Sequence, residues 1–302
     1  MKYLNYYSLK HNYRKYGKEK LFLDKNRYIN YSDIKVFFIC NEEILFKNNK
    51  IFFHFLNFSK LPNYFKKNAN FIVAESQHPI LAIKISKQLK NRDSLFDNTI
   101  TRKVRDCVNS LNKKESSIIS AAFFLIKWQN ANNYCGFCGG KTKTLDFGHV
   151  IICKNKVCKK RVFPRINPTI IVNVIHKNKI LLARNKSWPN SLYSCIAGFC
   201  ENNESIEDTV KREVFEEVGL MTKNISYKFS QFWPFPNNLM LGFFAYSDSN
   251  KLTVNKNELE DANWFSYKDL FSSSKKIILP HKRSIAFSLI NLWSKSFKHN
   301  LS

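Results

Sequence analysis

The stretch GFCENNESIEDTVKREVFEEVGL, residues 198–220, carries the strongest local structural signals in the chain. Ser205 is followed three residues later by Asp208, a spacing typical of a capped helix N-terminus. Gly219 suits the position after the last helical residue, because glycine readily adopts the left-handed backbone conformation found there. The sequence therefore predicts a helix that begins near Ser205 and ends at Gly219.

Three carboxylates share one face of this predicted helix. Glu213, Glu216 and Glu217 stand at positions i, i+3 and i+4. Like charges at this spacing destabilise a helix by roughly 0.2–0.5 kcal/mol per pair, so another factor must favour them. Mg²⁺ and Mn²⁺ are hard cations that bind carboxylate oxygens, and Arg212 could hold one carboxylate through a bidentate ion pair. The alternative is a solvated acidic helix, which would be a coincidence in a chain with only 23 acidic residues.

The complete spaced pattern resembles the Nudix box. Five residues separate Gly198 from Glu204, and seven more separate Glu204 from the run REVFEEVGL at 212–220. The resemblance implies the Nudix fold, an α/β/α sandwich with a mixed sheet between helices. It also implies hydrolysis of a nucleoside diphosphate linked to another group. The three glutamates would then bind the catalytic metal, helped by the backbone near Gly198.

The composition indicates a globular protein with more than one domain. The chain has 302 residues, of which 44% are hydrophobic and 15% aromatic, so it can bury a substantial core. No apolar run approaches the ~18–20 residues that cross a bilayer, and residues 1–20 have no apolar core behind their positive charges. We therefore expect a soluble, unexported, cytoplasmic protein that does not bind membranes.

The net charge of +26 has two interpretations. Clustered Lys and Arg attract polyanions such as nucleic acids and nucleotides. Alternatively, the many Lys, Asn, Ile and Phe residues and the 8 glycines reflect coding sequence rich in A and T, with the lysines solvated on an ordinary enzyme. The sequence leaves both interpretations open.

Hydrophobic patterning divides the chain into three parts, and the overall class is α+β. Residues 1–130 are predicted to form a β-rich α+β domain, residues 131–166 a small module, and residues 167–302 the Nudix domain. Short apolar runs predict strands, and spaced apolar positions predict helices. The predicted strands are residues 35–40, 42–47, 50–58, 70–75, 169–176 and 179–184, and the further predicted helices are 79–89, 110–129 and 284–295.

Four cysteines in the small module predict a zinc ribbon. Cys135 and Cys138 form one close pair, and Cys153 and Cys158 form a second, looser pair. Two pairs separated by ~15–20 residues are typical of a structural zinc site, which four thiolates close completely. Disulfides or free buried thiols are the alternatives, but disulfides are rare in the reducing cytoplasm. We expect one structural Zn²⁺ in each chain.

A second resemblance narrows the family to the NADH pyrophosphatases. Residues 230–238, SQFWPFPNN, are similar to the SQPWPFPxS array of that subfamily, with Phe232 in place of Pro and Asn238 in place of Ser. The zinc ribbon before the Nudix domain is also typical of it, and FPRINP at 163–168 resembles its YPRxDP link. Residues 279–293 resemble its closing segment. The resemblance covers roughly residues 118–293.

The subfamily's substrate-binding roles carry over to individual positions. Phe199 would stack on the nicotinamide or base ring, and Gln231 and Met240 would line the same pocket. Phe163 would be contributed by the partner subunit of a homodimer, and Ala286 would lie near the nucleotide. The alternative for the two phenylalanines is a place in the core, and for Met240 and Ala286 it is simple packing.

The resemblance also implies a reaction. NADH or NAD⁺ and water would give nicotinamide mononucleotide and AMP, with Mg²⁺ or Mn²⁺ as the catalytic ion. Glu217 is the first choice for the residue that positions or deprotonates the water, and Glu258 is the second choice and a further metal ligand; a surface position is the alternative for Glu258. Other functions stay open: removal of an NAD cap from RNA, hydrolysis of ADP-ribose or diadenosine polyphosphates, or a zinc-ribbon binding module without activity.

Overall fold

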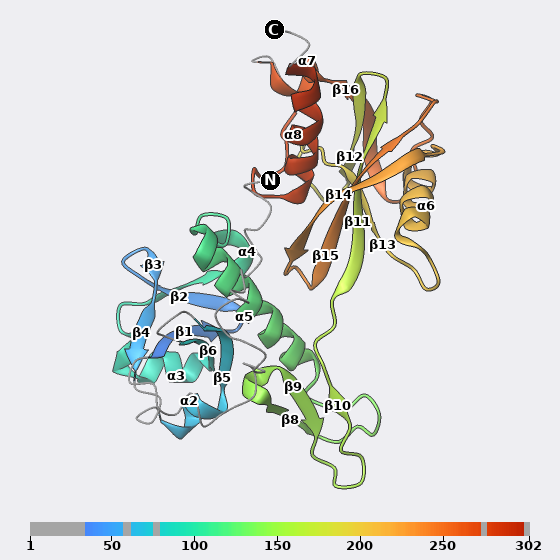
Figure 1. Cartoon of the computed structure of the whole chain (residues 1–302). Coiled ribbons are helices and arrows are strands. Elements are labelled where there is room, and N and C mark those ends of the chain that lie inside the picture. Colours follow the sequence, from blue (N-terminus) through green and yellow to red (C-terminus); the bar gives the residue numbers. More distant parts are fainter. Residues whose placement is uncertain (1–33, 57–61, 75–78, 273–276, 299–302) are drawn as a thin grey trace. The chain divides into compact units, whose positions relative to one another are not determined.

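The computed structural model describes residues 34–56, 62–74, 79–272 and 277–298 (Figure 1). The chain divides into two compact units. Of the described residues, the C-terminal unit contains Ile166–Trp233 and those from Asn237 onward, and the N-terminal unit contains those from Ile34 to Arg165 together with Pro234–Pro236. The domain boundary proposed at 166/167 lies one residue from this division, whereas the one proposed at 130/131 lies inside the N-terminal unit. The charged start at residues 1–20 lies outside the described residues.

The C-terminal unit is built on a six-stranded mixed sheet. β11 pairs with β15 in parallel, and the other pairings are antiparallel. The strand order is β14 (Lys223–Trp233), β15 (Asn238–Tyr246), β11 (Asn167–His176), β12 (Lys179–Asn185) and β16 (Leu259–Ser266), with β13 (Ile196–Phe199) also paired to β11. The strands expected at 169–176 and 179–184 are confirmed.

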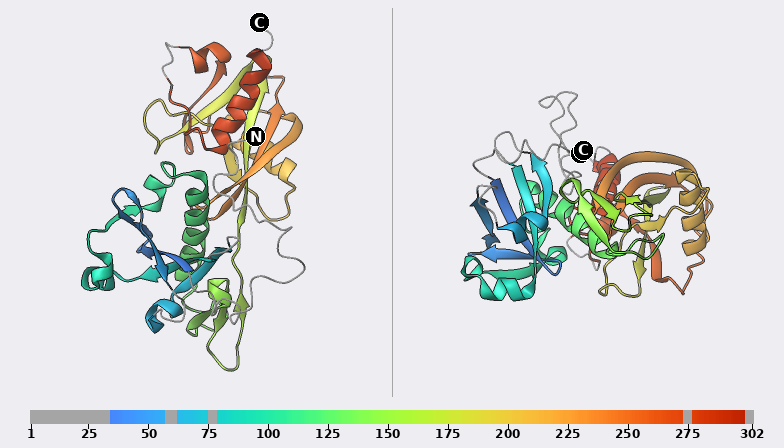
Figure 2. Two further views of the ribbon diagram at one scale, coloured as in Figure 1. Left: turned by 60° about the vertical axis from the view of Figure 1, so that its left-hand side comes forward. Right: turned by 90° about the horizontal axis from the view of Figure 1, so that it is seen from below.

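Alternation along β11 buries both faces of this sheet. Ile170, Val172 and Val174 pack in one core with the valines of α6 (Ile206–Val218). Ile171 and Ile175 pack in a second core with α8 (Ile285–Lys298), the expected closing helix. The two helices therefore cover opposite faces, as Figure 1 and the right-hand view of Figure 2 show. The short helix α7 (Tyr267–Phe271) follows β16. The expected α/β/α sandwich is confirmed.

The N-terminal unit contains a seven-stranded sheet. β1 lies inside it, pairing with β2 and β4 antiparallel and with β6 in parallel. The strands are β1 (Ile34–Cys40), β2 (Glu43–Lys47), β3 (Lys50–Ile51), β4 (Phe53–Leu56), β5 (Ala69–Ala74), β6 (Pro79–Ile85) and β7 (Ile100–Lys103). The helices are α2 (Asn63–Lys67), α3 (Lys87–Arg92), α4 (Val104–Cys107) and α5 (Lys113–Ala131). The region is β-rich, as expected.

The long helix α5 matches the helix expected at 110–129. It begins with a capping box in which the Asn112 side chain accepts from Glu115 N–H and the Glu115 carboxylate accepts from Asn112 N–H. Its buried positions include Ile118, Ile119 and Phe123. The reciprocal cap and the apolar face explain why this stretch is helical despite its β-branched residues.

The helix expected at 79–89 is wrong over most of its length. Residues Pro79–Ile85 form strand β6, which lies between β1 and β5, and a helix begins only at Lys87 after the capping side chain of Ser86. A short apolar run fits a buried strand and a buried helix equally well by its spacing. Pairing on both edges of β6 decides the outcome in favour of the strand.

A small three-stranded sheet lies among the four cysteines in the sequence, and Cys153 ends one of its strands. Its order is β10 (Arg161–Val162), β9 (Val150–Cys153) and β8 (Thr142–Leu145), all antiparallel. This sheet follows α5 within the N-terminal unit. None of the helices in the described residues is both long and apolar enough to span a membrane.

Candidate functional site

Helix α6 presents the glutamates as the sequence predicts. The Ser205 side chain accepts a hydrogen bond from Asp208 N–H at 3.1 Å at the helix start, and Gly219 ends the helix with a φ of 71°. Val210, Val214 and Val218 are fully buried in the sheet-facing core and fix the rotation of the helix. The expected bounds of this helix are confirmed.

Arg212 organises the carboxylates around it. Its guanidinium donates to both oxygens of Glu204, at 2.5 Å from Nε and 3.0 Å from Nη2, so the bidentate ion pair forms with Glu204 and not with one of the three helix glutamates for which it was expected. Nη1 donates to Glu213 at 2.9 Å and to Glu216 at 3.0 Å. Nη2 also donates to the Phe199 carbonyl at 2.8 Å, which ties β13 to α6. One cation therefore sets the positions of three carboxylates and of the strand end beside them.

The Arg212 contact leaves a clear electrostatic signature on Glu204. Hydrogen bonds from Arg212 and from the Glu201 N–H lower the pKa of the Glu204 carboxyl to about 2. The Thr209 hydroxyl donates a further bond to the same carboxylate at 2.9 Å. Glu204 is therefore ionised, and both of its carboxylate oxygens accept hydrogen bonds. It fixes the position of Arg212.

Glu217 has the opposite environment. Its side chain is buried, and burial, followed by the charges of Glu213, Glu258 and Glu216, raises its pKa to about 8. Burial also raises the pKa of Glu213, although Arg212 opposes that shift. Both raised pKa values mean that burial and neighbouring carboxylates disfavour the ionised form of these carboxyls. A divalent cation bound among them would stabilise that ionised form. The donor set, all carboxylate oxygen, fits Mg²⁺ or Mn²⁺.

Gly198 makes room for the glutamate cluster. A Cβ atom added at position 198 would collide with the carboxylate of Glu213. Glycine is therefore the residue that lets β13 lie directly against the ligand face of α6. This close approach gives a physical reason for the glycine at the start of the spaced pattern.

Glu258 is brought to the cluster by the loop before β16. Asn255 N–H donates to the Glu217 carbonyl at 2.9 Å, and the Asn255 side chain donates to Glu258 at 3.4 Å. The charge of Glu258 contributes to the raised pKa of Glu213 and Glu217. Glu258 is exposed, yet it lies within electrostatic reach of both buried carboxylates.

The four cysteines are gathered more tightly than the glutamates. Within the described ranges of the chain, they are the one group of potential ligands whose donor atoms all lie within 4.8 Å of one another. The Sγ atoms of Cys135 and Cys158 are 3.8 Å apart, and those of Cys138 and Cys153 are 3.5 Å apart. A tetrahedron with metal–sulfur bonds of about 2.3 Å has edges of about 3.8 Å, so the cluster fits one tetrahedral ion. Disulfides, at about 2.05 Å, are excluded.

Backbone geometry shapes both halves of the cysteine cluster. The N–H groups of Phe137 and Cys138 lower the pKa of the Cys135 thiol to about 7, which favours a thiolate. In the looser second pair, Cys153 N–H donates to the Lys160 carbonyl at 2.9 Å and closes the loop that carries Cys158. The wider spacing of this pair is therefore compatible with one shared ion.

Both candidate aromatic contacts are exposed. Phe199 on β13 is 52% exposed, and Phe163, which follows β10, is 57% exposed. The alternative that they are core residues is excluded, because core aromatics of these units are nearly inaccessible to solvent. Their contact with substrate stays a prediction.

Gln231, Met240 and Ala286 lie inside the C-terminal unit. The Gln231 amide donates to the Arg283 carbonyl at 2.8 Å and accepts from Ile285 N–H at 2.8 Å, so it fixes the start of α8. Met240 on β15 and Ala286 on the first turn of α8 are buried in the same core. These positions agree with the alternative that both residues serve in simple packing, and their contact with a nucleotide stays a prediction.

Sequence reasoning missed the roles of Glu204 and Asn255. Glu204 occupied a fixed position of the spaced pattern but had no assigned task, whereas the structure makes it the principal partner of Arg212. The sequence did contain a signal for this role of Glu204, because an arginine that contacts several carboxylates requires one partner that fixes its own position. Asn255 had no signal, since only the folded loop brings its N–H to α6.

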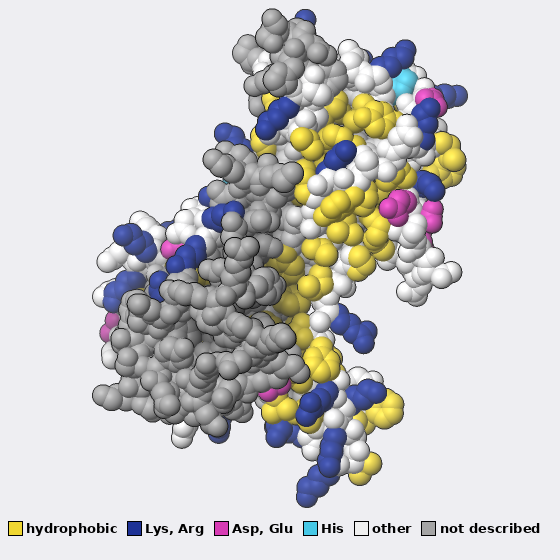
Figure 3. Space-filling view, in the orientation of Figure 1, with side chains coloured by type: hydrophobic (Ala, Val, Ile, Leu, Met, Phe, Trp, Pro, Cys, Tyr) yellow, Lys and Arg dark blue, Asp and Glu magenta, His cyan; other side chains and the backbone are white. Residues whose placement is uncertain are grey.

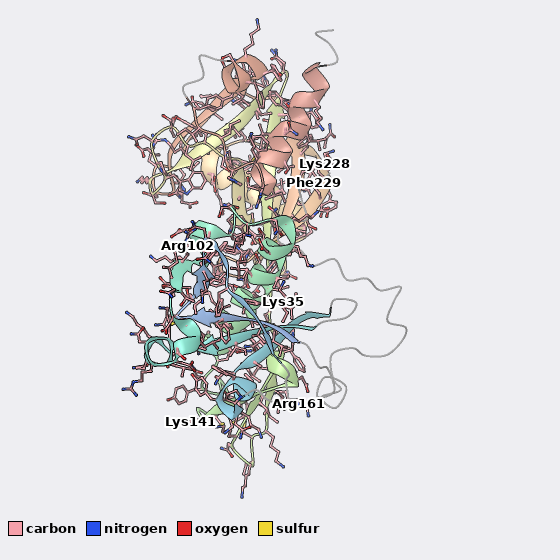
Figure 4. All side chains as sticks on the ribbon, turned by 90° about the vertical axis from the view of Figure 1, so that its left-hand side faces the viewer. Lys35, Arg102, Lys141, Arg161, Lys228 and Phe229 are labelled. Atoms are coloured by element: carbon pink, nitrogen blue, oxygen red, sulfur yellow. The ribbon has the colours of Figure 1, made fainter. Side chains whose placement is uncertain are left out.

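The basic residues are widely distributed. Lys and Arg side chains are spread over the face seen in Figure 3, where acidic side chains are few. Of the basic residues labelled in Figure 4, Lys35 and Arg102 lie on the seven-stranded sheet, Lys141 directly before β8, Arg161 on β10 and Lys228 on β14.

Comparison with known proteins identifies the domain. Residues 165–286 match the NUDIX domain family. The chain is 36% identical over 196 residues to the human NAD-capped RNA hydrolase NUDT12, covering 61% of this chain and 42% of the relative. It is 42% identical over 166 residues to NudC, an NAD-capped RNA hydrolase of Pseudomonas putida, covering 55% and 57%. It is 36% identical over 207 residues to the mouse mitochondrial NAD(P)H pyrophosphatase NUDT13, covering 63% and 58%.

The chain spans about half the length of the curated relatives it matches. Among solved structures, it resembles a NUDIX hydrolase from Nitrosomonas europaea at 17% identity and a TM-score of 0.43, covering 55% of this chain and 93% of that one. The family match spans the spaced glutamate pattern, β13 and the start of α8. The chain therefore carries a Nudix domain at residues 165–286.

Proposed function

We propose that this protein hydrolyses the diphosphate bond of NADH or NAD⁺ to give nicotinamide mononucleotide and AMP. The observation that carries the proposal is the Arg212-bound glutamate cluster with Glu217 buried inside it. A diphosphate substrate brings two negative charges, which a cluster of carboxylates can bind only together with divalent cations. The Nudix domain and the names of its relatives support the same chemistry.

Glu213, Glu216 and Glu217 would hold Mg²⁺ or Mn²⁺, with Glu258 as a further ligand. A bound divalent ion neutralises phosphate charge and lowers the pKa of a bound water. Arg212 keeps Glu213 and Glu216 in fixed rotamers, because its guanidinium donates to both. Glu217 would accept the proton of the attacking water, and Glu258 is the alternative base.

The dinucleotide would be recognised beside this cluster. Phe199 exposes its ring at the end of β13, next to the strand residue that contacts Glu213, and is suited to stacking on nicotinamide or adenine. Gln231 would support the pocket by fixing the start of α8, and Met240 and Ala286 would form its floor. We propose that Phe163 acts from a second copy of the chain, so that the enzyme works as a homodimer.

We propose that the four-cysteine cluster binds one Zn²⁺ with a structural role. Four thiol ligands fill every tetrahedral position, and the Sγ separations match a zinc tetrahedron. An ion bound in this way has no open position for water, so it would stabilise the small sheet and take no part in hydrolysis.

A second substrate is the NAD cap at the 5′ end of RNA. It presents the same dinucleotide end, and two of the relatives are named NAD-capped RNA hydrolases. The net charge of +26 also favours attraction of an RNA body, through phosphate contacts that weaken as salt increases. ADP-ribose and diadenosine polyphosphates are further candidates with the same bond.

Product analysis tests the proposal. The purified protein is incubated with NADH, NAD⁺, ADP-ribose or NAD-capped RNA, with Mg²⁺, with Mn²⁺ or with no added divalent ion, and products are separated by chromatography. The Glu217→Gln variant reports on the cluster, and Glu207→Gln is the matched control because Glu207 is exposed on the first turn of the same helix.

We expect AMP and nicotinamide mononucleotide from the free dinucleotide, only with added metal, and loss of both products in Glu217→Gln. A higher kcat/KM with capped RNA than with free NADH would make RNA the main substrate. If none of the four compounds is hydrolysed, the proposal is wrong. Phe232 and Asn238, which depart from the subfamily array, are then the first residues to test as the cause of the lost activity.

A further inference from the structure

A polar hollow of about 170 Å³ lies within the N-terminal unit, far in sequence from the Nudix glutamates. It forms where the start of β5, the end of α5 and β8 meet. Gln129 joins these elements, because its Nε2 donates to Asn70 Oδ1 at 2.5 Å and to the Gly148 carbonyl at 2.8 Å. Asn70 is only 3% exposed, and a Cβ at Gly148 would collide with it. The hollow is therefore held by specific packing between elements.

The lining of this hollow is cationic and rich in hydrogen-bond donors. Three lysines come from three different elements: Lys67 from α2, Lys84 from β6 and Lys143 from β8. No acidic residue is found among the described residues that line it. The other polar lining residues are Asn68, Asn70, Gln129, Asn130, Asn133, Thr142 and Thr144.

The lysines are the main donors that the lining offers to a ligand. The side-chain amides of Asn68, Asn70, Gln129 and Asn133 already donate to acceptors of the protein. The Lys84 ammonium donates one hydrogen bond to Oδ1 of Asn130, which leaves two of its three hydrogens. A ligand that binds these ammonium groups must supply acceptors.

The local charge is strongly positive. No carboxylate of the described residues forms an ion pair with any of the three lysines, which together carry three positive charges. The C-terminal end of α5 adds about half a negative charge. Its last carbonyls are covered by side-chain amides, since Asn132 donates to Trp128 at 2.7 Å and Asn133 donates to Asn130 at 2.8 Å. The helix end therefore offsets only a small part of the lysine charge.

The volume limits the size of the ligand. Pockets for whole small-molecule ligands usually measure ~300–1,000 Å³, and a water occupies about 30 Å³. A hollow of 170 Å³ admits a phosphate group with a few waters but not a complete nucleotide. Lysine and amide donors are typical partners of phosphate oxygens.

We propose that the hollow formed by Lys67, Lys84 and Lys143 is a binding site for the phosphate group of a small phosphorylated compound. The site is separate from the Nudix chemistry and does not depend on the function proposed above. Free inorganic phosphate and the terminal phosphate of a nucleotide such as AMP present the same group to it. Binding there would join α2, β6 and β8 through one shared anion.

Isothermal titration of inorganic phosphate into the full-length protein tests the site. The titration is done at low ionic strength without added divalent ions, for the wild type and for Lys84→Gln, Lys143→Gln and Lys87→Gln. Lys87 is the matched control, because it is exposed on α3 of the same unit and its substitution removes the same charge. Thermal unfolding and metal content of each variant show whether the fold is retained.

We expect one phosphate per chain, at least tenfold weaker binding in Lys84→Gln, several-fold weaker binding in Lys143→Gln and a change below twofold in Lys87→Gln. Since Lys143 is exposed, its variant tests the site even if Lys84→Gln unfolds. AMP should compete with phosphate for the same site. Equal affinities in all four proteins would overturn the proposal, as would Lys84-dependent binding of a short RNA without any binding of inorganic phosphate.

Discussion

The cysteine cluster and the glutamate cluster are two sets of potential metal ligands that the same chain holds in opposite ways. The four Sγ atoms lie within 4.8 Å of one another, since thiols can be neutral and approach closely. The spacing of Glu213, Glu216 and Glu217 follows from their positions on α6, and Arg212 holds two of them from the side. The cysteine cluster is geometrically complete, whereas the glutamate cluster is electrostatically incomplete until cations bind.

Coordination separates the two clusters further. Glu216 and Glu258 are exposed beside the buried Glu213 and Glu217, so one side of the glutamate cluster is open to solvent and to a substrate. In the cysteine cluster Cys135 and Cys153 are buried and Cys138 is exposed, but four thiols together fill every position around one tetrahedral ion. Backbone N–H groups are also directed at sulfur, such as Asn155 N–H to Cys153 at 3.4 Å. Closed coordination suits a structural ion, and open coordination suits a catalytic one.

Removing one cysteine should have the largest effect. Cys153→Ser leaves three thiols, and we expect loss of the stoichiometric zinc together with unfolding of the small sheet, because binding of a structural zinc contributes on the order of 10 kcal/mol. Metal analysis and thermal unfolding measure both effects. Cys107→Ser is the control, since Cys107 is equally buried but lies outside the cluster. A Cys153→Ser protein that still binds one zinc tightly would contradict the four-ligand assignment.

Glu217→Gln should have the next largest effect, on turnover alone. The substitution keeps the shape of the side chain and removes both a metal ligand and the proposed base. We expect kcat for NADH to fall by about 10²–10⁴-fold, the usual contribution of a general base, with unchanged zinc content. Steady-state kinetics at saturating Mg²⁺ measure it, with Glu207→Gln as control. Turnover within threefold of the wild type would remove Glu217 from the mechanism.

The two clusters also differ in how far the sequence could predict them. Covalent spacing alone brings Cys135 to Cys138, and the paired pattern predicts one shared site that the structure then assembles. On α6, helical periodicity places the glutamates on one face and the cap residues fix the helix bounds. Features of this kind can be predicted because residues close together in the sequence determine them.

Properties that depend on distant segments could not be predicted. Residues 79–85 were predicted to be helical because a short apolar run fits a helix and a strand equally well. Pairing with β1 and β5 makes them strand β6. The place of Gln231 beside substrate stays a prediction, but no local pattern indicated that the start of α8, more than fifty residues away, binds both ends of its amide. The lysine hollow likewise combines α2, β6 and β8, whose meeting no local pattern indicates.

Replacing Arg212 should have an intermediate effect that tests how the glutamates are held. Arg212→Lys keeps the charge but loses the planar fork that binds Glu204 through both oxygens while also bonding Glu213 and Glu216. We expect kcat to fall by about 10–100-fold, as for other groups that orient metal ligands, with a higher Mg²⁺ concentration for half-maximal activity. Arg184→Lys is the control, because Arg184 forms a single ion pair with Glu260. Activity within twofold of the wild type would mean that charge alone suffices.

The smallest effect should be on stability, and it should depend on pH. In the protein without added divalent ions, burial raises the pKa of Glu217 from 4.5 to about 8. Between these values the folded state binds more protons than the unfolded state, so this carboxyl makes the wild type progressively less stable as pH rises from about 4.5 to 8. The Glu217→Gln variant has a neutral side chain at this position at every pH, so it does not lose stability in this way as pH rises.

We therefore expect Glu217→Gln to unfold at a temperature a few degrees above the wild type at pH 8 and at the same temperature near pH 4.5. A stability change of ~1 kcal/mol shifts the midpoint of a domain of this size by roughly 2–4 °C, so scanning calorimetry across this pH range can resolve it. Added Mg²⁺ should stabilise the wild type more than the variant, because the ion favours the ionised carboxylates. Equal midpoints at pH 8 would mean that the buried charge of Glu217 does not destabilise the fold, and the contrast with the cysteine cluster would then rest on ligand type and geometry alone.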